Sequence, residues 1–123
     1  MFLITGLSLA FRNFAVFSGR ASRAEYWSFI VAADVVIFLL FLLGIRAGLF
    51  LLLAYVFALL AVIPEISIAV RRLHDTGRSG WFLLLGIIPF VGSIVVLVLM
   101  LLPGDRGQNA YGSPRPPLGQ LAL

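Results

Sequence analysis

Three long apolar stretches determine what this chain can fold into. Residues 26–43, 47–70 and 81–102 each contain at most one charged side chain, and polar segments separate them. An α-helix rises ~1.5 Å per residue, so a stretch of about 20 apolar residues crosses the ~30 Å hydrocarbon layer of a bilayer. We therefore expect about three membrane-spanning helices. The first two form an antiparallel hairpin, because only Gly44, Ile45 and Arg46 connect them.

Composition supports a membrane environment. Of the 123 residues, 62% are hydrophobic and 11% are charged. A soluble domain has about a quarter charged residues, and a chain this short could not bury so much apolar surface by itself. The predicted fold class is therefore an all-α membrane protein, with residues 18–102 as its transmembrane helical domain. The absence of cysteine excludes disulfides and thiolate metal sites.

The two ends of the chain differ from this central domain. Apolar residues recur at three- and four-residue spacings in residues 1–17, which predicts an amphipathic helix lying in the membrane interface, with a disordered terminus as the alternative. Residues 103–123 are rich in Gly, Pro and polar residues and predict an irregular tail. Within the third stretch, Gly86, Pro89 and Gly92 either bend the helix or divide it into two half-helices. A re-entrant third segment would return the tail to the side of the N-terminus.

Arginine counts predict the orientation. All nine basic residues are Arg. With three spans, the N-terminal segment and the loop 71–80 share one side and hold six Arg, against three on the other side. Cytoplasmic loops are enriched in basic residues. We therefore expect the N-terminus and residues 71–80 on the cytoplasmic side of a bacterial inner membrane.

The hairpin is expected to bring two charged segments together at that face. Arg side chains bind carboxylates in pairs and also bind phosphates. One interpretation is a set of ion pairs that ties the helices together. The other is a site for an anionic lipid headgroup or for an acidic segment of a partner protein. The candidate residues are Arg20, Arg23, Glu25, Arg71, Arg72, His74, Asp75 and Arg78.

Two acidic residues, Asp34 and Glu65, fall inside the expected spans. Intramembrane acids are costly and often mark ion or proton paths, so the alternative function is a component of a small oligomeric transporter or channel. The structural interpretation is that Glu65 pairs with Arg71 or Arg72, while Asp34 faces other helices. Aromatic side chains gather at membrane interfaces, and the predicted interface anchors are Tyr26, Trp27 and Trp81.

The sequence offers no catalytic, metal or cofactor site. His74-Asp75 has the form of a metal-binding pair, but His74 is the single histidine and no further ligand set accompanies it. Phosphate-binding glycine loops are absent. We expect a non-enzymatic protein whose partners are membrane lipids, a second copy or another membrane protein, and not nucleic acid.

Two motifs and the tail resemble a known family. Residues 17–27 read FSGRASRAEYW and residues 71–81 read RRLHDTGRSGW. These segments are similar to the small bacterial inner-membrane proteins of the YhaH type, a family catalogued as a domain of unknown function. The tail is similar at Gly107, Asn109, Tyr111 and Gly112, but Ala110 stands where a basic residue is usual. The resemblance implies an inner-membrane location and an α-helical architecture, and it implies no activity.

Overall fold

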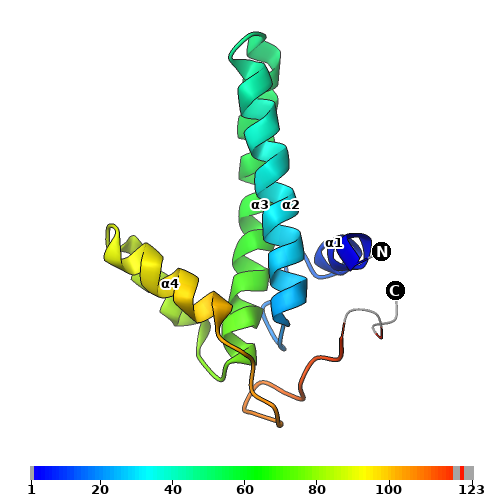
Figure 1. Cartoon of the computed structure of the whole chain (residues 1–123), viewed down its shortest axis with the longest axis vertical. Coiled ribbons are helices and arrows are strands. Elements are labelled where there is room, and N and C mark those ends of the chain that lie inside the picture. The colour runs from blue at the N-terminus through cyan, green and yellow to red at the C-terminus, as the bar shows by residue number, and fades with distance from the viewer. Residues whose placement is uncertain (1, 118–119, 121–123) are drawn as a thin grey trace.

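The chain forms a tall helical hairpin with all its other elements gathered at one end (Figure 1). The computed structural model describes residues 2–117 and 120, and within them no strand is present. The expected all-α fold is confirmed. The elements are α1 (Phe2–Arg12), α2 (Arg23–Gly44), α3 (Gly48–Asp75), the 3₁₀ helix η1 (Gly80–Ile87) and α4 (Val91–Leu101).

The start of α2 is fixed by a capping box. The Oγ atom of Ser22 accepts a hydrogen bond from the backbone N–H of Glu25 at 3.1 Å, and Oε1 of Glu25 accepts one from the N–H of Ser22 at 3.3 Å. These bonds satisfy donors that the first turn of a helix leaves without partners. The 22 residues of α2 and the 28 of α3 rise ~33 and ~42 Å. Both helices are long and apolar enough to cross a bilayer.

Small residues let α2 and α3 pack closely. Ala33, Ala54 and Ala61 are buried in the hairpin, and a β-carbon at Gly44 would lie 2.6 Å from the backbone nitrogen of Leu51. Large side chains such as Leu59 instead point outward and are exposed. Exposing apolar surface to water costs about 25 cal/mol per Å², whereas acyl chains cover it without that cost. The outer surface of the hairpin therefore suits a lipid environment.

The third apolar stretch, residues 81–102, is not one continuous helix. It consists of η1, with eight residues, and α4, with eleven, so each rises only ~16 Å and neither can cross a bilayer. The two elements pack against each other beside the lower part of the hairpin (Figure 1). This corrects the expectation of a continuous third span. Of the two alternatives for this stretch, the division near Pro89 is the one observed.

The reversal between η1 and α4 has a local cause. Proline has no N–H and disfavours a helical residue before it. Ile88 is accordingly extended, with φ −70° and ψ 120°, and Phe90 adopts a left-handed φ of 60°. Gly92 then allows the close approach of the two elements, since a β-carbon there would collide with the carbonyl oxygen of Leu85.

The N-terminal helix α1 runs across the hairpin instead of along it (Figure 1). Gly6 lies so close to Ser28 that a β-carbon at Gly6 would collide with the Ser28 hydroxyl. The hydroxyl of Ser67, on α3, donates to the carbonyl oxygen of Phe14 at 2.9 Å and so holds the segment that follows α1. Phe11 and Phe14 are exposed. An interfacial position for residues 1–17 stays a prediction, with exposed apolar rings in its favour.

The tail lies against the same end of the hairpin as residues 71–80. The backbone N–H of Asp105 donates to the carbonyl oxygen of Asp75 at 2.7 Å. A tail on the same side as the N-terminus and residues 71–80 is what we expect if the third apolar stretch is re-entrant. The expected tail extends to residue 123, and residues 118, 119 and 121–123 lie outside the described part of the chain.

Candidate functional site

We call the end of the hairpin formed by residues 18–25, 71–80 and 103–115 the base. Its centre is the buried side chain of Arg20, which belongs to the linker between α1 and α2. Nε of Arg20 donates to Oδ1 of Asp75 at 2.8 Å. The other nitrogens donate to four backbone carbonyl oxygens, at 2.6 to 3.2 Å, which belong to Asp75, Asp105, Gly107 and Gly112. One side chain thus connects the linker, the end of α3 and the tail.

Arg72 is a second internal clamp and is fully buried. Nη1 of Arg72 lies 2.5 Å from Oδ2 of Asp75, so this carboxylate bridges two guanidinium groups. The remaining hydrogen bonds of Arg72 reach the carbonyl oxygens of Ala21, Met100 and Leu102. Carbonyl oxygens at the end of α4 lack helical partners. Arg72 therefore satisfies that helix end. It also holds η1 and α4, which together we call the re-entrant segment, against α3.

Glu25 fastens the tail at a separate point. Its carboxylate accepts two hydrogen bonds from Arg115, at 2.8 Å from Nε and 3.1 Å from Nη2. This paired geometry is the favourable one between guanidinium and carboxylate. The Glu25 side chain is buried, whereas the Arg115 side chain is 29% exposed. Glu25 thus closes the capping box of α2 and also anchors the tail.

His74 is held between the linker and the tail. Nδ1 of His74 lies 2.8 Å from the carbonyl oxygen of Gly19, and its ring stacks on Tyr111 with centroids 4.0 Å apart and planes within 3°. Asn109 donates to the carbonyl oxygen of His74 at 2.9 Å. Asp75 points instead to Arg20 and Arg72, so His74 and Asp75 have different partners. Within residues 2–117 and 120, no group of three or more His, Asp or Glu side chains could hold a metal ion.

The other arginines of the predicted cluster are less fully paired. Arg71 is buried, donates to the carbonyl oxygen of Asn13 at 3.4 Å, and leaves its Nε without a partner. Arg23 is exposed and reaches the carbonyl oxygen of Leu101 at 3.4 Å. Arg78 donates to the carbonyl oxygen of Thr76 at 3.2 Å. The structure thus brings all the predicted arginines to the base but gives them unequal roles.

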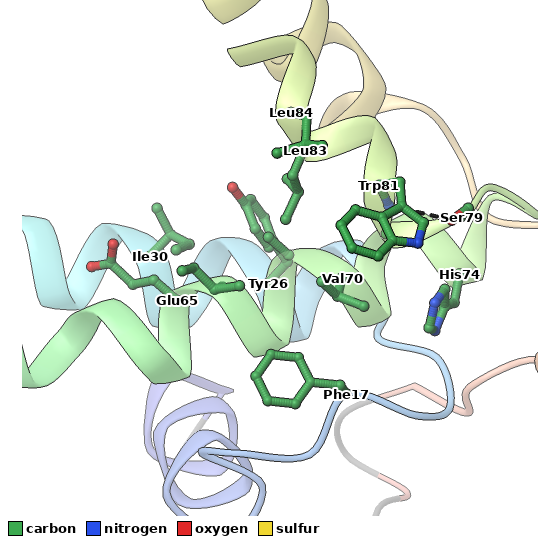
Figure 2. Close-up of a pocket in the computed structure, with 13 residues that line it drawn as sticks. Phe17, Tyr26, Ile30, Glu65, Val70, His74, Ser79, Trp81, Leu83 and Leu84 are labelled. Atoms are coloured by element: carbon green, nitrogen blue, oxygen red, sulfur yellow. Dashed lines mark hydrogen bonds between the residues drawn. The ribbon is translucent and has the colours of Figure 1, made fainter. Parts of the chain in front are cut away.

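The intramembrane acids lie in two different clefts. Glu65 lines a cleft of about 810 Å³ between α3 and η1, with Tyr26 and Trp81 also in its wall (Figure 2). Asp34 is exposed on α2 and lines a cleft of about 400 Å³ with Tyr55. The interpretation that Glu65 pairs with Arg71 or Arg72 is wrong, since Glu65 forms no ion pair within residues 2–117 and 120. Asp34 lies beside α3, since Leu51, Ala54 and Tyr55 of that helix line the same cleft.

The predicted interface anchors differ in environment. Tyr26 and Trp27 are half-buried and contact each other edge to face, with centroids 5.1 Å apart. Trp81 is 78% exposed and is the second residue of η1, where its backbone N–H donates to Oγ of Ser79 at 3.3 Å. An interfacial role for these rings stays a prediction, and Trp81 is the ring most free to contact headgroups.

The tail contributes residues that the sequence prediction left out of the cluster. These residues contact the other two segments of the base and are Asp105, Asn109, Tyr111 and Arg115. A continuous third span would have placed them on the opposite membrane face, and this is why they were missed. The tail motif at Asn109 and Tyr111 was the available signal, because both residues belong to the resemblance and both contact His74.

Comparison with known proteins identifies the family of this chain. Residues 14–113 match the family described as "Protein of unknown function (DUF805)". "Inner membrane protein YhaI" of Escherichia coli (strain K12) is 40% identical over 103 residues, covering 83% of this chain and 87% of that protein. "Inner membrane protein YhaH" of the same strain is 39% identical over 112 residues, covering 87% and 92%.

A more distant relative is "Uncharacterized protein YiiR" of the same strain, which is 34% identical over 127 residues and covers 78% of this chain and 83% of that protein. No solved structure matches the fold. The matched residues include both charged motifs, the re-entrant segment and the tail up to Ser113. The resemblance to the YhaH type is confirmed, and the chain belongs to the DUF805 family of membrane proteins.

Proposed function

We propose that this is a non-enzymatic inner-membrane protein whose base lies on the cytoplasmic surface and binds anionic phospholipid headgroups. The observation that supports it is the position of the arginines. Eight of the nine lie at or beside the base, and Arg46 alone lies at the far end of the hairpin. The re-entrant segment brings Arg106 and Arg115 to the same end of the hairpin as the other six. The two ends therefore hold eight Arg and one Arg, whereas a three-span topology would divide them six to three. Basic residues flanking spans favour the cytoplasmic side.

The base keeps a surplus of positive charge after its internal pairing. Eight guanidinium groups face three carboxylates, those of Glu25, Asp75 and Asp105, which leaves five positive charges. Arg20 and Arg72 are buried in hydrogen bonds to protein atoms and serve the fold. Arg12, Arg23 and Arg106 are exposed and form no ion pair within the described residues. Exposed basic residues at the membrane surface each contribute about 1 kcal/mol of attraction to anionic lipid.

The test is native mass spectrometry of the purified chain with phosphatidylglycerol and phosphatidylcholine. The informative variant is Arg12→Gln/Arg23→Gln/Arg106→Gln, because these side chains do not belong to the buried clamps. We expect the wild type to retain phosphatidylglycerol preferentially and the triple variant to lose that preference. Arg46→Gln, at the opposite end, is the matched control and should retain it. Equal lipid retention by wild type and the triple variant would refute the headgroup proposal.

A further inference from the structure

The cleft between α3 and η1 combines an apolar wall with one uncompensated acid. Its volume of about 810 Å³ falls in the range of small-molecule sites. Glu65 lies toward one end and His74 toward the other, with the rings of Tyr26, Phe17 and Trp81 between them in this view (Figure 2). None of the residues that line the cleft is Arg. The cleft thus differs from the base in having no Arg in its lining, although His74, Ser79 and Gly80 of the base form part of its wall.

Glu65 lacks any charge partner in the described chain. Its Oε1 atom is buried without a hydrogen-bond partner, and no ion pair involves its carboxylate within residues 2–117 and 120. An isolated carboxylate inside a membrane domain is unfavourable unless a proton or a cation compensates it. The cleft is the open space beside this group. A cation bound in the cleft would supply this compensation, and the lining of the cleft contains no Arg that could do so.

The aromatic side chains in the wall of the cleft also favour a cation. An aromatic face attracts a cation placed within about 6 Å of its centroid, and Trp is the most effective ring. Three aromatic side chains line this cleft, and Trp81 and Phe17 are exposed. The remaining wall consists mostly of aliphatic side chains, including Ile30, Ile66 and Val70. Such a wall holds an apolar body, not a hydrated metal ion.

We propose that this cleft binds an amphiphilic organic cation, an apolar molecule with one ammonium- or phosphonium-type charge, and that Glu65 is its counter-ion. The inference does not depend on headgroup binding at the base. An acyl chain could fill the same volume, but only a proton could then neutralise the Glu65 carboxylate. The experiment must therefore distinguish a bound organic cation from a bound acyl chain.

The experiment measures binding of radiolabelled tetraphenylphosphonium to the full chain in phosphatidylcholine nanodiscs, which carry no net lipid charge. Wild type should bind the probe saturably, and unlabelled tetraphenylphosphonium should displace it. The neutral analogue triphenylphosphine oxide should not. Glu65→Gln should weaken binding at least about tenfold, the change expected when about 1.4 kcal/mol of charge-assisted attraction is lost.

Two further variants control for indirect effects. Asp34→Asn removes the other intramembrane acid, which lines a different cleft, and should leave binding unchanged. Trp81→Leu keeps an apolar side chain but removes the aromatic face, and should weaken binding several-fold. Because Glu65→Gln removes an unpaired charge, we expect it to fold as stably as wild type, which a thermal unfolding curve in the same nanodiscs verifies.

Three outcomes would overturn the proposal. The first is an absence of saturable binding of the cation to wild type. The second is binding of the cation to Glu65→Gln as tight as to wild type. The third is equal competition by the neutral analogue, which would identify the cleft as a groove for acyl chains.

Discussion

Arg20 and Asp75 stand 55 positions apart in the sequence and form a buried ion pair, with Nε of Arg20 2.8 Å from Oδ1 of Asp75. The pair closes the base, because Arg20 precedes α2 and Asp75 is the last residue of α3. The second carboxylate oxygen of Asp75 is occupied by Arg72 at 2.5 Å. The Asp75 carboxylate thus compensates the charges of two buried guanidinium groups. The other nitrogens of these two groups donate to backbone carbonyl oxygens.

Replacing Asp75 should therefore destabilise the whole fold. Asp75→Asn preserves the shape of the side chain but leaves Arg20 and Arg72 buried without a counter-charge. Removing one partner of a buried ion pair costs about 3–5 kcal/mol. We expect a loss of this order in the free energy of unfolding, measured by denaturant titration of the helical circular dichroism signal in detergent micelles. Arg46→Gln, on the exposed connection at the far end, should change it by less than about 0.5 kcal/mol. Equal stability of the two variants would contradict the clamp.

The ion pair between Glu25 and Arg115 should govern the exposure of the tail. Glu25→Gln keeps an oxygen for the capping box but loses the charge that holds Arg115. We expect trypsin to cleave after the exposed Arg106 faster in Glu25→Gln than in wild type, as followed by mass spectrometry. Ser22→Ala separates the two roles of Glu25, since it removes the cap at a cost of about 1 kcal/mol and leaves the ion pair in place. Cleavage as slow in Glu25→Gln as in Ser22→Ala would refute the anchor.

The sequence predicted those parts of the fold that depend on local pattern. The apolar lengths of 26–43 and 47–70 indicated the two long helices, and Ser22 with Glu25 indicated the capping box that starts α2. The hairpin then followed from the short connection, and with it the meeting of the two arginine motifs. These features depend on neighbouring residues, so periodicity and spacing reveal them.

The sequence did not predict features that depend on tertiary partners. Apolar length alone could not decide whether 81–102 crosses the bilayer or folds back, because Pro89 is compatible with both. The return of α4 depends on Arg72, which reaches the carbonyl oxygens of Met100 and Leu102. The ion pair between Arg115 and Glu25 forms only because α4 folds back. It could therefore not be predicted from the sequence alone.

The stack of His74 on Tyr111 should be visible by nuclear magnetic resonance. The chain has one histidine, so selective isotope labelling yields a single imidazole spin system. A ring stacked at 4.0 Å shifts the imidazole protons upfield. We expect Tyr111→Phe to preserve that shift, because it keeps an aromatic ring, and Tyr111→Ala to abolish it. Identical imidazole shifts in wild type and Tyr111→Ala would show that the tail does not occupy this position.

Two glycines of the re-entrant segment should respond differently to the same substitution. A β-carbon at Gly92 would collide with the carbonyl oxygen of Leu85, whereas one at Gly86 would make an ordinary contact at 3.7 Å with Val96. We therefore expect Gly92→Ala to separate η1 from α4 and lower the melting temperature, and Gly86→Ala to leave it nearly unchanged. Thermal unfolding in micelles compares the two variants. Equal melting temperatures would mean that η1 and α4 do not pack at this distance.

The topology itself is testable because the chain contains no cysteine, so each introduced thiol reports one position. Ser18 and Ser113 are exposed residues of the base, and Ala47 is exposed in the connection between α2 and α3. In spheroplasts, a membrane-impermeant maleimide should label Ala47→Cys directly. It should label Ser18→Cys and Ser113→Cys only after the membrane is permeabilised. A continuous third span would instead place Ser113 on the same side as Ala47. Labelling of Ser113→Cys without permeabilisation would therefore contradict the re-entrant segment, because η1 and α4 are each too short to carry the tail across the bilayer.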